Sequence, residues 1–347
     1  MTTVELRQAT VAFGTGSRRL LAVNSVDLTV QGGAVMGLVG ESASGKSTVA
    51  KAVTGLVSLT SGQILLDGGP IGELRRRSRA QRRRVQMVFQ DPYASLNPRM
   101  PIGESVAEAL PARRRSRGMA RDEVAALLEL VGLDADRAPM PPSSLSGGQR
   151  QRVALARELA AKPEVLVADE ITSSLDVSVQ GAILNLLREL QQSMGFGMLF
   201  ISHNLAVVRY VSDSVAVMYQ GRVVEQGECE ALLASPAHPY TQALLAAVPS
   251  TYAARFAPEL VVDGEAQDPH HQPTGCAFHP RCPQGPRVLP DRAACVEADP
   301  HVDAAARLHQ AACHFAPVRA VNGNVLTETA VPHPREPRAQ PVAQNPS

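Results

Sequence analysis

The sequence GESASGKS at residues 40–47 decides how this chain folds. The apolar run VMGLVG, residues 35–40, precedes it and predicts a short strand, and KSTVAKAV, residues 46–53, follows it and predicts a helix. The spacing fits the pattern G-x-x-x-x-G-K-[ST], in which glycines let backbone N–H groups close around phosphate groups. In this pattern Lys46 neutralises the β- and γ-phosphates, the Ser47 hydroxyl binds Mg²⁺, and the helix dipole favours the anion. The alternative is a chance Gly-rich turn, and the strand–turn–helix setting favours a nucleotide-binding loop over it. The residues expected to bind nucleotide are Gly40, Glu41, Ser42, Ala43, Ser44, Gly45, Lys46, Ser47 and Thr48.

A second apolar strand ends in two carboxylates. Residues 165–170 read VLVADE. Behind a phosphate-binding loop, Asp169 is predicted to complete the Mg²⁺ shell, and Glu170 to polarise the water that attacks the γ-phosphate. An isolated Asp-Glu pair would be explained equally well by a solvated strand end. The position of this pair after the loop favours the catalytic interpretation.

The hydrophobic pattern extends the fold on both sides of these motifs. Residues 4–13 and 25–30 predict strands, and residues 91 to about 145 predict a helical insertion. A helix over 177–190 and the strand MLFIS at 198–202 then restore the alternation of strands and helices. This alternation is typical of an α/β protein with a mainly parallel sheet covered on both faces.

Composition limits the function classes. The chain has 347 residues, of which 44% are apolar and 3% aromatic, with no Trp and a formal net charge of +1. This charge indicates neither a nucleic-acid nor a membrane-surface partner, and the scarcity of aromatics disfavours a stacking platform for single strands. The sequence has no apolar run of 18 residues and its first residues do not resemble a signal peptide, so we expect a cytosolic chain that reaches a membrane only through a partner.

Residues 145–152, LSGGQRQR, resemble the signature motif of ABC ATPases. In that family the motif begins a helix and faces the γ-phosphate held by a second subunit, so the resemblance implies two subunits that close head to tail over ATP. Gln90 matches the Q-loop glutamine at Mg²⁺ and water, SSLD at 173–176 matches the D-loop, and His203 matches the switch histidine at the γ-phosphate. The resemblance adds the nucleotide-contacting residues Ser146, Gly147, Gly148, Gln149 and Asp176, and it implies the catalytic set Glu170, Gln90 and His203, with Ser47, Gln90 and Asp169 at Mg²⁺.

Three further segments resemble one branch of this family, the oligopeptide, dipeptide and nickel importers. They are QDPYASLNPRM at 90–100, HPYTQALL at 238–245, and GCAFHPRCP at 275–283 followed by Cys295 and ACH at 312–314. The first segment looks more like the F-type ATPase of such transporters, which pairs with a D-type paralogue.

This resemblance implies an ATP-hydrolysing subunit that energises import of di- and oligopeptides. The implied partners are a second, D-type ATPase subunit, two integral membrane permeases and an extracytoplasmic solute-binding protein, with no nucleic acid, and the implied location is the cytoplasmic face of the cell membrane. The same motor serving nickel or another small solute is the alternative. A non-transport ABC ATPase is the rival from another class, and it lacks support because the chain contains neither a second ATPase unit nor a coiled-coil insertion.

The implied fold is a P-loop NTPase (RecA-like) core with an antiparallel β subdomain and a helical subdomain. We expect an ABC ATPase domain over residues 1–250, with the helical subdomain at about 91–155. A small Cys-containing domain is expected over 251–317, and a Pro- and Ala-rich disordered tail over 318–347.

Four of the five cysteines lie close together in the sequence: Cys276, Cys282, Cys295 and Cys313. Their spacing matches neither a zinc C-x₂-C pair nor a ferredoxin run. Four thiols in a segment with few apolar residues suggest a staple. Some members of the resembled branch hold a 4Fe–4S cluster at equivalent cysteines, and zinc, disulfides or no metal remain as alternatives. Cys229 is expected to be a plain thiol.

An aromatic residue, two departures from the family pattern and a run of arginines remain to be interpreted. Phe13 is the candidate for stacking on adenine, and ordinary core is the alternative. Ala43 and Ile171 stand where the family usually has Gly and Pro, and a methyl group at 43 is costly only if the local φ is positive. The Arg-rich run at 74–84 could bind nucleic acid or anionic lipid, but a solvated helical arm is the simpler interpretation.

Overall fold

The structure is a computed structural model, and it describes residues 2–16, 19–91, 95–111, 117–173, 175–247, 272–300 and 309–316. The expected tail at 318–347 lies outside these residues, as do 92–94 of the segment after Gln90, Ser174, and the beginning of the expected Cys-containing domain.

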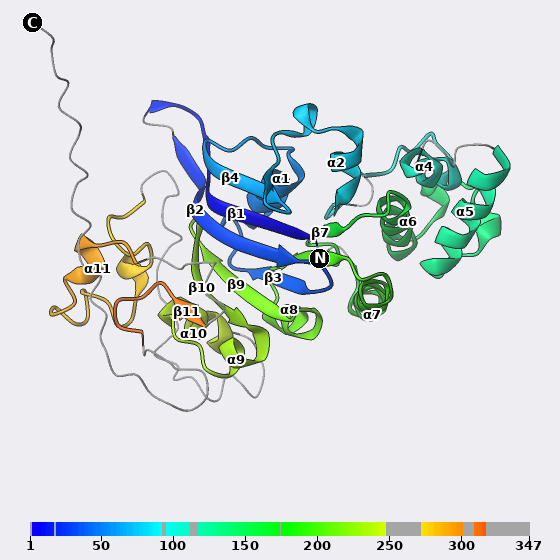
Figure 1. Cartoon of the computed structure of the whole chain (residues 1–347). Helices are drawn as coiled ribbons and strands as arrows, with labels where there is room; N and C mark the ends of the chain where they lie inside the picture. The colour runs from blue at the N-terminus through cyan, green and yellow to red at the C-terminus, as the bar shows by residue number, and fades with distance from the viewer. Residues whose placement is uncertain are drawn as a thin grey trace, which may run out of the picture.

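A seven-stranded sheet forms the centre of the molecule (Figure 1). Its strands, in spatial order, are β11 (Gln310–Ala311), β10 (Arg222–Glu228), β9 (Ser214–Tyr219), β3 (Val35–Val39), β8 (Gly197–Ser202), β7 (Val165–Asp169) and β6 (Val85–Val88). The strands from β9 to β6 are parallel, whereas β10 and β11 are antiparallel to their neighbours. The expected parallel sheet is therefore confirmed. Because β3, β7 and β8 are adjacent and parallel, their carboxyl ends meet at one edge, where ligands bind in such sheets.

A second, four-stranded antiparallel sheet confirms the expected β subdomain. Its order is β2 (Leu20–Gln31), β1 (Thr3–Phe13), β4 (Ser61–Leu66) and β5 (Gly69–Pro70). Helix α1 (Lys46–Thr54) packs against strands of both sheets, and one apolar core joins its buried face to both. This packing fixes the first turn of α1, and with it the loop at 40–47, against two rigid layers.

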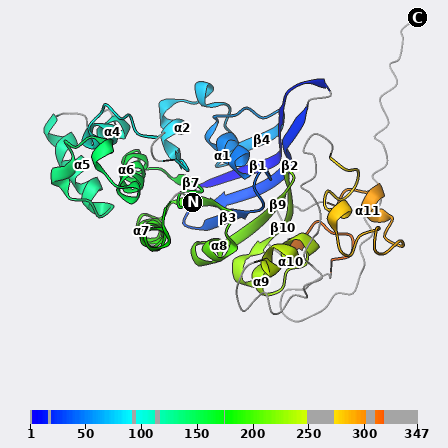
Figure 2. The same ribbon diagram turned by 180° about the vertical axis from the view of Figure 1, so that it is seen from behind.

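Helices cover the rest of the central sheet. Helices α4, α5 and α6 gather at one end of the molecule, which both views show (Figures 1 and 2). The helices other than α1 are α2 (Arg79–Arg84), α4 (Ile102–Ala109), α5 (Arg117–Leu130), α6 (Gly147–Ala160), α7 (Val177–Met194), α8 (Leu205–Val211), α9 (Cys229–Ala234), α10 (Pro239–Ala246) and α11 (Ala294–Glu297), with 3₁₀ turns at Leu74–Arg76, Ala135–Arg137, Pro142–Ser144 and His279–Arg281. None of the helices in the described residues is long and apolar enough to cross a membrane.

The Arg-rich run is helical and mostly exposed, as expected, but one of its arginines is buried. Arg77 is buried, and its guanidinium donates to the carbonyls of Val53 and Gly72, both at 2.8 Å. Burial lowers the pKa of Arg77 to about 10. Arg84 forms an ion pair with Glu164 at 2.7 Å. Arg77 and Arg84 therefore tie the run to the chain after α1 and to the start of β7.

The segment that carries the cysteines is fastened to the central sheet. β11 adds to the edge of β10, and aromatic rings join the segment to β9 and α10. The ring of Phe278 lies 5.2 Å from that of Tyr219 and 5.4 Å from that of Tyr240, and the two tyrosine rings are 4.6 Å apart. All three side chains are almost fully buried, so this contact is part of the core.

Candidate functional site

The loop at 40–47 has the backbone shape that its glycines allow. Gly45 ends the loop with φ +104°, a conformation that side chains rarely adopt. A Cβ on Gly45 would lie 2.1 Å from the carbonyl oxygen of Ala22, and a Cβ on Gly40 would lie 2.1 Å from that of Met218. Neither position accepts another residue without moving backbone. Because no side chain caps α1, its first N–H groups remain available to an anion.

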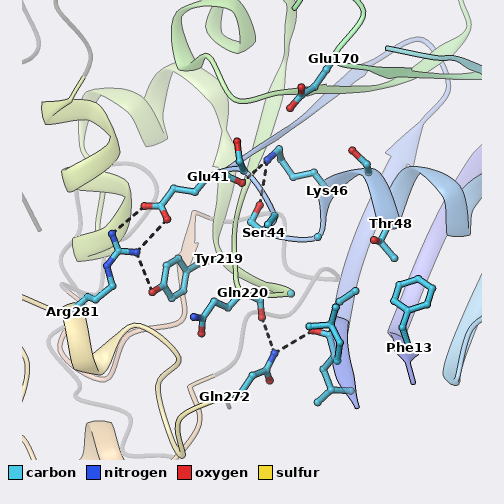
Figure 3. Close-up of a pocket in the computed structure, with 18 residues that line it drawn as sticks. Phe13, Glu41, Ser44, Lys46, Thr48, Glu170, Tyr219, Gln220, Gln272 and Arg281 are labelled. Carbon is cyan, nitrogen blue, oxygen red and sulfur yellow. Dashed lines mark hydrogen bonds and ion pairs between the residues drawn. The ribbon is translucent and has the colours of Figure 1, made fainter. Parts of the chain in front are cut away.

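Lys46 points back into the loop. Its Nζ donates to the carbonyls of Glu41 at 2.7 Å and Gly40 at 2.8 Å, and to the hydroxyl of Ser44 at 3.3 Å (Figure 3). Burial lowers the pKa of Lys46, while the carboxylates of Glu170 and Asp169 oppose that shift. A buried cation surrounded by carbonyls and open N–H groups is the arrangement that a phosphate group requires.

The loop forms one wall of a cavity of about 540 Å³, a size typical of nucleotide-sized ligands. Phe13 from β1 lies on one side of the cavity, and Tyr219 and Gln220 lie on the other (Figure 3). Phe13 is 43% exposed, so the alternative that it belongs to the core is wrong. Its ring lies near Thr48, open to the cavity, where a base can stack on it.

Two oxygen ligands converge next to the loop. The Ser47 hydroxyl donates to Oδ1 of Asp169 at 3.1 Å, although the two residues come from different elements, α1 and β7. Burial raises the pKa of Asp169, and the hydrogen bond from Ser47 opposes that rise. A hydroxyl and a buried carboxylate at this separation suit Mg²⁺, because this ion prefers oxygen ligands. Its positive charge would also compensate the negative charge of the buried carboxylate.

The expected catalytic residues lie together at the end of β7. Nδ1 of His203 lies 3.4 Å from Oε1 of Glu170. Gln90 reaches the same place through Ser173, whose hydroxyl accepts from Nε2 of Gln90 at 3.2 Å and donates to the carbonyl of Glu170 at 2.9 Å. Glu170 lines the cavity with its side chain 17% exposed. The arrangement places a carboxylate beside the phosphate loop, with a histidine and an amide next to it.

Three residues that line this cavity have positive φ without being glycine. They are Ala43 at +63°, Glu170 at +47° and Gln220 at +43°. Strained backbone of this kind collects at functional sites, where the surrounding fold holds it in place. The sequence left the cost of Ala43 dependent on the sign of φ, and the positive value makes its methyl group costly. Ile171, the other departure, is 1% exposed and packs into the core.

The signature-like segment lies away from this cavity. Ser146 caps α6, accepting from the N–H of Gln149 at 3.3 Å, and Oε1 of Gln149 accepts from the N–H of Ser146 at 3.0 Å. Gly148 packs closely on Val179 at the start of α7, which Asp176 precedes as the N-cap residue. The described residues that line the cavity include none of Ser146, Gly147, Gly148, Gln149 and Asp176. Within one chain, the predicted site is therefore only partly assembled.

Sequence reasoning missed a group of residues from the far end of the chain. The hydroxyl of Tyr240 accepts from the N–H of Glu41 at 2.9 Å, and Arg281 forms an ion pair with the Glu41 carboxylate at 3.2 Å. Gln272 lines the cavity and donates to the carbonyls of Leu21 and Gln220, both at 3.2 Å (Figure 3). Tyr240 and Arg281 lie inside the segments 238–245 and 275–283, which served only to indicate the family. Their resemblance to that family was the one signal in the sequence that could have pointed to these two residues.

The cysteine segment does not support the iron–sulfur expectation. Four cysteines, Cys276, Cys282, Cys295 and Cys313, line one small cavity of about 10 Å³. Among the described residues no group of three or more His, Cys, Asp or Glu is arranged to hold a metal, and all five cysteines are free. Burial raises the pKa of each of the four thiols, to about 12 for Cys276 and about 11 for Cys282. Cys229 is a buried thiol, as expected.

Comparison with known protein families matches most of this architecture. The model described as "ABC transporter" matches residues 23–173, and the model described as "Oligopeptide/dipeptide transporter, C-terminal region" matches residues 224–287. The "Probable peptide ABC transporter ATP-binding protein y4tS" of Sinorhizobium fredii is 49% identical over 277 residues, which are 78% of this chain and 77% of the relative. The "Di/tripeptide transport ATP-binding protein DppF" of Pseudomonas aeruginosa is 47% identical over 270 residues, 77% of this chain and 84% of the relative.

Solved structures agree with the fold. A dimeric ATP-binding cassette, MJ0796, bound to ADP and phosphate after hydrolysis, is similar with a TM-score of 0.57 and 28% identity. The likeness covers 65% of this chain and 98% of that one. The cbiO1 protein of Clostridium perfringens, part of an ABC transporter complex, has a TM-score of 0.60 and 28% identity over 67% of this chain and 90% of its own. The P-loop NTPase core expected from the sequence is confirmed.

Proposed function

The chain belongs to the ATP-binding subunits of ABC transporters that carry the oligopeptide/dipeptide C-terminal region, and from this premise we propose that it binds and hydrolyses ATP to energise the import of peptides. The observation that carries the proposal is the single cavity in which Lys46, Ser47 and Glu170 meet. The names of the relatives support peptides as the transported solute.

The geometry supports a division of roles among the site residues. The loop N–H groups and Lys46 bind the β- and γ-phosphates, and Phe13 stacks on the base. Ser47 and Asp169 hold Mg²⁺ in this proposal, and Gln90 is proposed to reach the same ion, which would neutralise charge on the phosphate oxygens. The remaining residues, Gly40, Glu41, Ser42, Ala43, Ser44, Gly45 and Thr48, shape the phosphate wall.

Glu170 is the proposed base for the attacking water. Its carboxylate stands at the cavity wall, and Nδ1 of His203 lies 3.4 Å from it. In this proposal His203 also contacts the γ-phosphate. The resulting electrostatic stabilisation of the transferring phosphoryl group supplies most of the catalysis in reactions of this class. Replacing Glu170 by Gln keeps the shape of the side chain and removes the proton acceptor, so ATP binding survives and turnover stops.

The position of the signature-like segment supports a second ATPase subunit. Ser146, Gly147, Gly148 and Gln149 lie at the start of α6, outside the cavity of their own chain, and are free to face the nucleotide of a partner. We infer that this partner is a D-type paralogue, that closure of the pair over ATP moves two membrane permeases, and that a solute-binding protein delivers the peptide. The chain then works at the cytoplasmic face of the membrane through these partners.

The domain boundaries are also proposals. The ATPase domain is taken as 1–250, with its helical part at about 91–155, and the C-terminal domain as 251–317. The clustering of α4, α5 and α6 supports the helical part. The C-terminal family model matches residues 224–287 and so extends to both sides of the proposed boundary at 250.

Uptake by cells that lack this chain tests the proposed function. Labelled dipeptides, oligopeptides and nickel are supplied in parallel, with the deletion complemented by wild type, by Glu170→Gln, or by Glu189→Gln, an exposed glutamate on α7 that serves as a matched control. We expect peptide uptake to be restored by wild type and the Glu189 variant but not by the Glu170 variant. Normal peptide uptake in the deletion strain would contradict the peptide assignment, and restoration by Glu170→Gln would contradict the role of Glu170.

A further inference from the structure

Glu41 is an unusual residue for the wall of a triphosphate site. It is the one acidic residue in the loop at 40–47, and its side chain is 41% exposed toward the cavity. An uncompensated carboxylate at this position would repel the phosphate groups of ATP, and the repulsion would be strong because a cavity wall screens charge less than bulk water does.

Arg281 compensates this charge from the opposite end of the chain. Its Nη1 lies 3.2 Å from Oε2 of Glu41 and its Nη2 lies 3.4 Å from Oε1, and Figure 3 shows this bidentate contact. The Arg281 side chain is 14% exposed, and its Nη1 also donates to the hydroxyl of Tyr219 at 3.4 Å. The guanidinium stacks 5.8 Å from the centre of the Tyr219 ring. Arginine is well suited to a paired carboxylate contact of this geometry.

The position of Arg281 is fixed by its own segment. Phe278, three residues earlier, is buried against Tyr219 and Tyr240, and Gln272 is bonded to the carbonyls of two cavity-lining residues. The amide of Gln272 is satisfied by the protein itself, because its Oε1 also accepts from Asn24 at 3.1 Å. The C-terminal segment is therefore held against the cavity, and Arg281 is the group that it contributes to the phosphate wall.

We propose that Arg281 is a positioning residue of the nucleotide site, which neutralises Glu41 so that the loop can accept the triphosphate of ATP. This proposal rests on the proposed function, in that the cavity binds ATP. It goes further because it assigns part of the affinity for ATP to the C-terminal segment. The sequence motifs alone predict no contact between that segment and the nucleotide. Tight binding of ATP then requires residues on both sides of the proposed domain boundary at 250 to be folded together.

The two partners of the ion pair have opposite effects if charge is what matters. Removing the positive charge with Arg281→Gln leaves Glu41 unpaired beside the phosphates and weakens ATP binding. Removing the negative charge with Glu41→Gln leaves Arg281 unpaired there and strengthens it. If the pair instead only held the loop in shape, both substitutions would weaken binding and their combination would be no better than either.

Equilibrium binding of Mg-ATP to the full chain, followed with a fluorescent ATP analogue in competition, separates these cases. We expect Arg281→Gln to raise the Kd for ATP about tenfold at low ionic strength, since one charge close to a triphosphate is worth roughly this factor. Glu41→Gln is expected to lower the Kd severalfold, and the double variant to return close to wild type. The effects should shrink as salt is added, because screening weakens them. Arg281→Lys, which keeps the charge, should retain most of the affinity.

Arg287→Gln is the matched control. Arg287 belongs to the same segment, is exposed, and donates to the carbonyl of Pro280 rather than to the cavity. The Arg287→Gln variant should bind ATP with the Kd of the wild type. An unchanged Kd in Arg281→Gln, or a double variant as weak as Arg281→Gln, would overturn the proposal. If Arg281→Gln fails to fold, Glu41→Gln decides alone, because weaker binding in that variant contradicts the charge argument. Failure of the wild type to bind Mg-ATP would instead count against the proposed function.

Discussion

Ala43 offers a direct test of backbone strain in the phosphate loop. Its φ of +63° lies in the left-handed region, which costs an L-residue with a side chain about 1–2 kcal/mol. Glycine removes that cost, but its larger conformational entropy stabilises the unfolded chain by about 0.4–1 kcal/mol. The Ala43 side chain is exposed, so its loss removes little buried surface. Ala43→Gly is therefore expected to raise the free energy of unfolding by up to about 1.5 kcal/mol.

A second Ala→Gly substitution provides the comparison. Ala182 is also exposed but lies within the long helix α7, where glycine costs about 1 kcal/mol relative to alanine. The same chemical change should thus have opposite effects on stability at the two positions, with a difference of up to about 2.5 kcal/mol.

The assay is thermal unfolding of the nucleotide-free chain at one scan rate, with urea unfolding as a check. For a domain of this size about 1 kcal/mol moves the midpoint by roughly 2–4 °C. Ala43→Gly should melt above wild type and Ala182→Gly below it. If Ala43→Gly melts as low as Ala182→Gly, the strain argument is refuted and the loop tolerates its alanine without cost.

Three further predictions follow from the described contacts. Phe13→Ala should raise the Kd for ATP by roughly tenfold in a nucleotide titration, since loss of base stacking costs about 1–3 kcal/mol, and an unchanged Kd would remove Phe13 from the site. Tyr240→Phe removes the acceptor of the Glu41 N–H and should lower the unfolding free energy by about 1 kcal/mol, whereas an unchanged midpoint would mean that water replaces it. Burial, opposed by Arg157, raises the pKa of the Glu158 carboxyl above its unfolded value of 4.5, so the folded chain binds this proton more tightly and loses stability as pH rises above that value. Glu158→Gln should accordingly melt above wild type at neutral pH and lose this advantage near pH 4.5, and equal midpoints at neutral pH would contradict the burial argument.

Local sequence was sufficient for the phosphate loop and the residues at the strand ends. Gly45 and Lys46 are adjacent in the chain, so the local sequence motif predicts their relative positions directly. Glu170 and His203 could also be predicted to approach each other, because each follows a strand and β7 and β8 are parallel neighbours in one sheet. The structure places their side chains 3.4 Å apart at the shared edge.

Contacts between distant parts of the chain could not be predicted in the same way. Arg281 meets Glu41 across 240 positions of sequence, and no periodic pattern records which carboxylate an arginine will find. The burial of Arg77 was missed for a related reason, since a run of arginines is usually solvated and only the packing of the chain after α1 reveals the carbonyls that it binds. The sign of φ at Ala43 depended on the path of the whole loop and not on the identity of the residue.

The short strand β11 has a consequence for the order in which the protein is made. Gln310 and Ala311 cover part of the edge of β10, yet the ribosome produces them long after every other strand of the sheet. Until they emerge, the N–H and C=O groups of β10 at that edge are open, and an open strand edge is a template on which a second nascent copy can pair. A recombinant fragment that stops before residue 309 would keep this edge permanently exposed. We therefore expect such fragments to self-associate during expression, even when they contain every residue that contacts the phosphates.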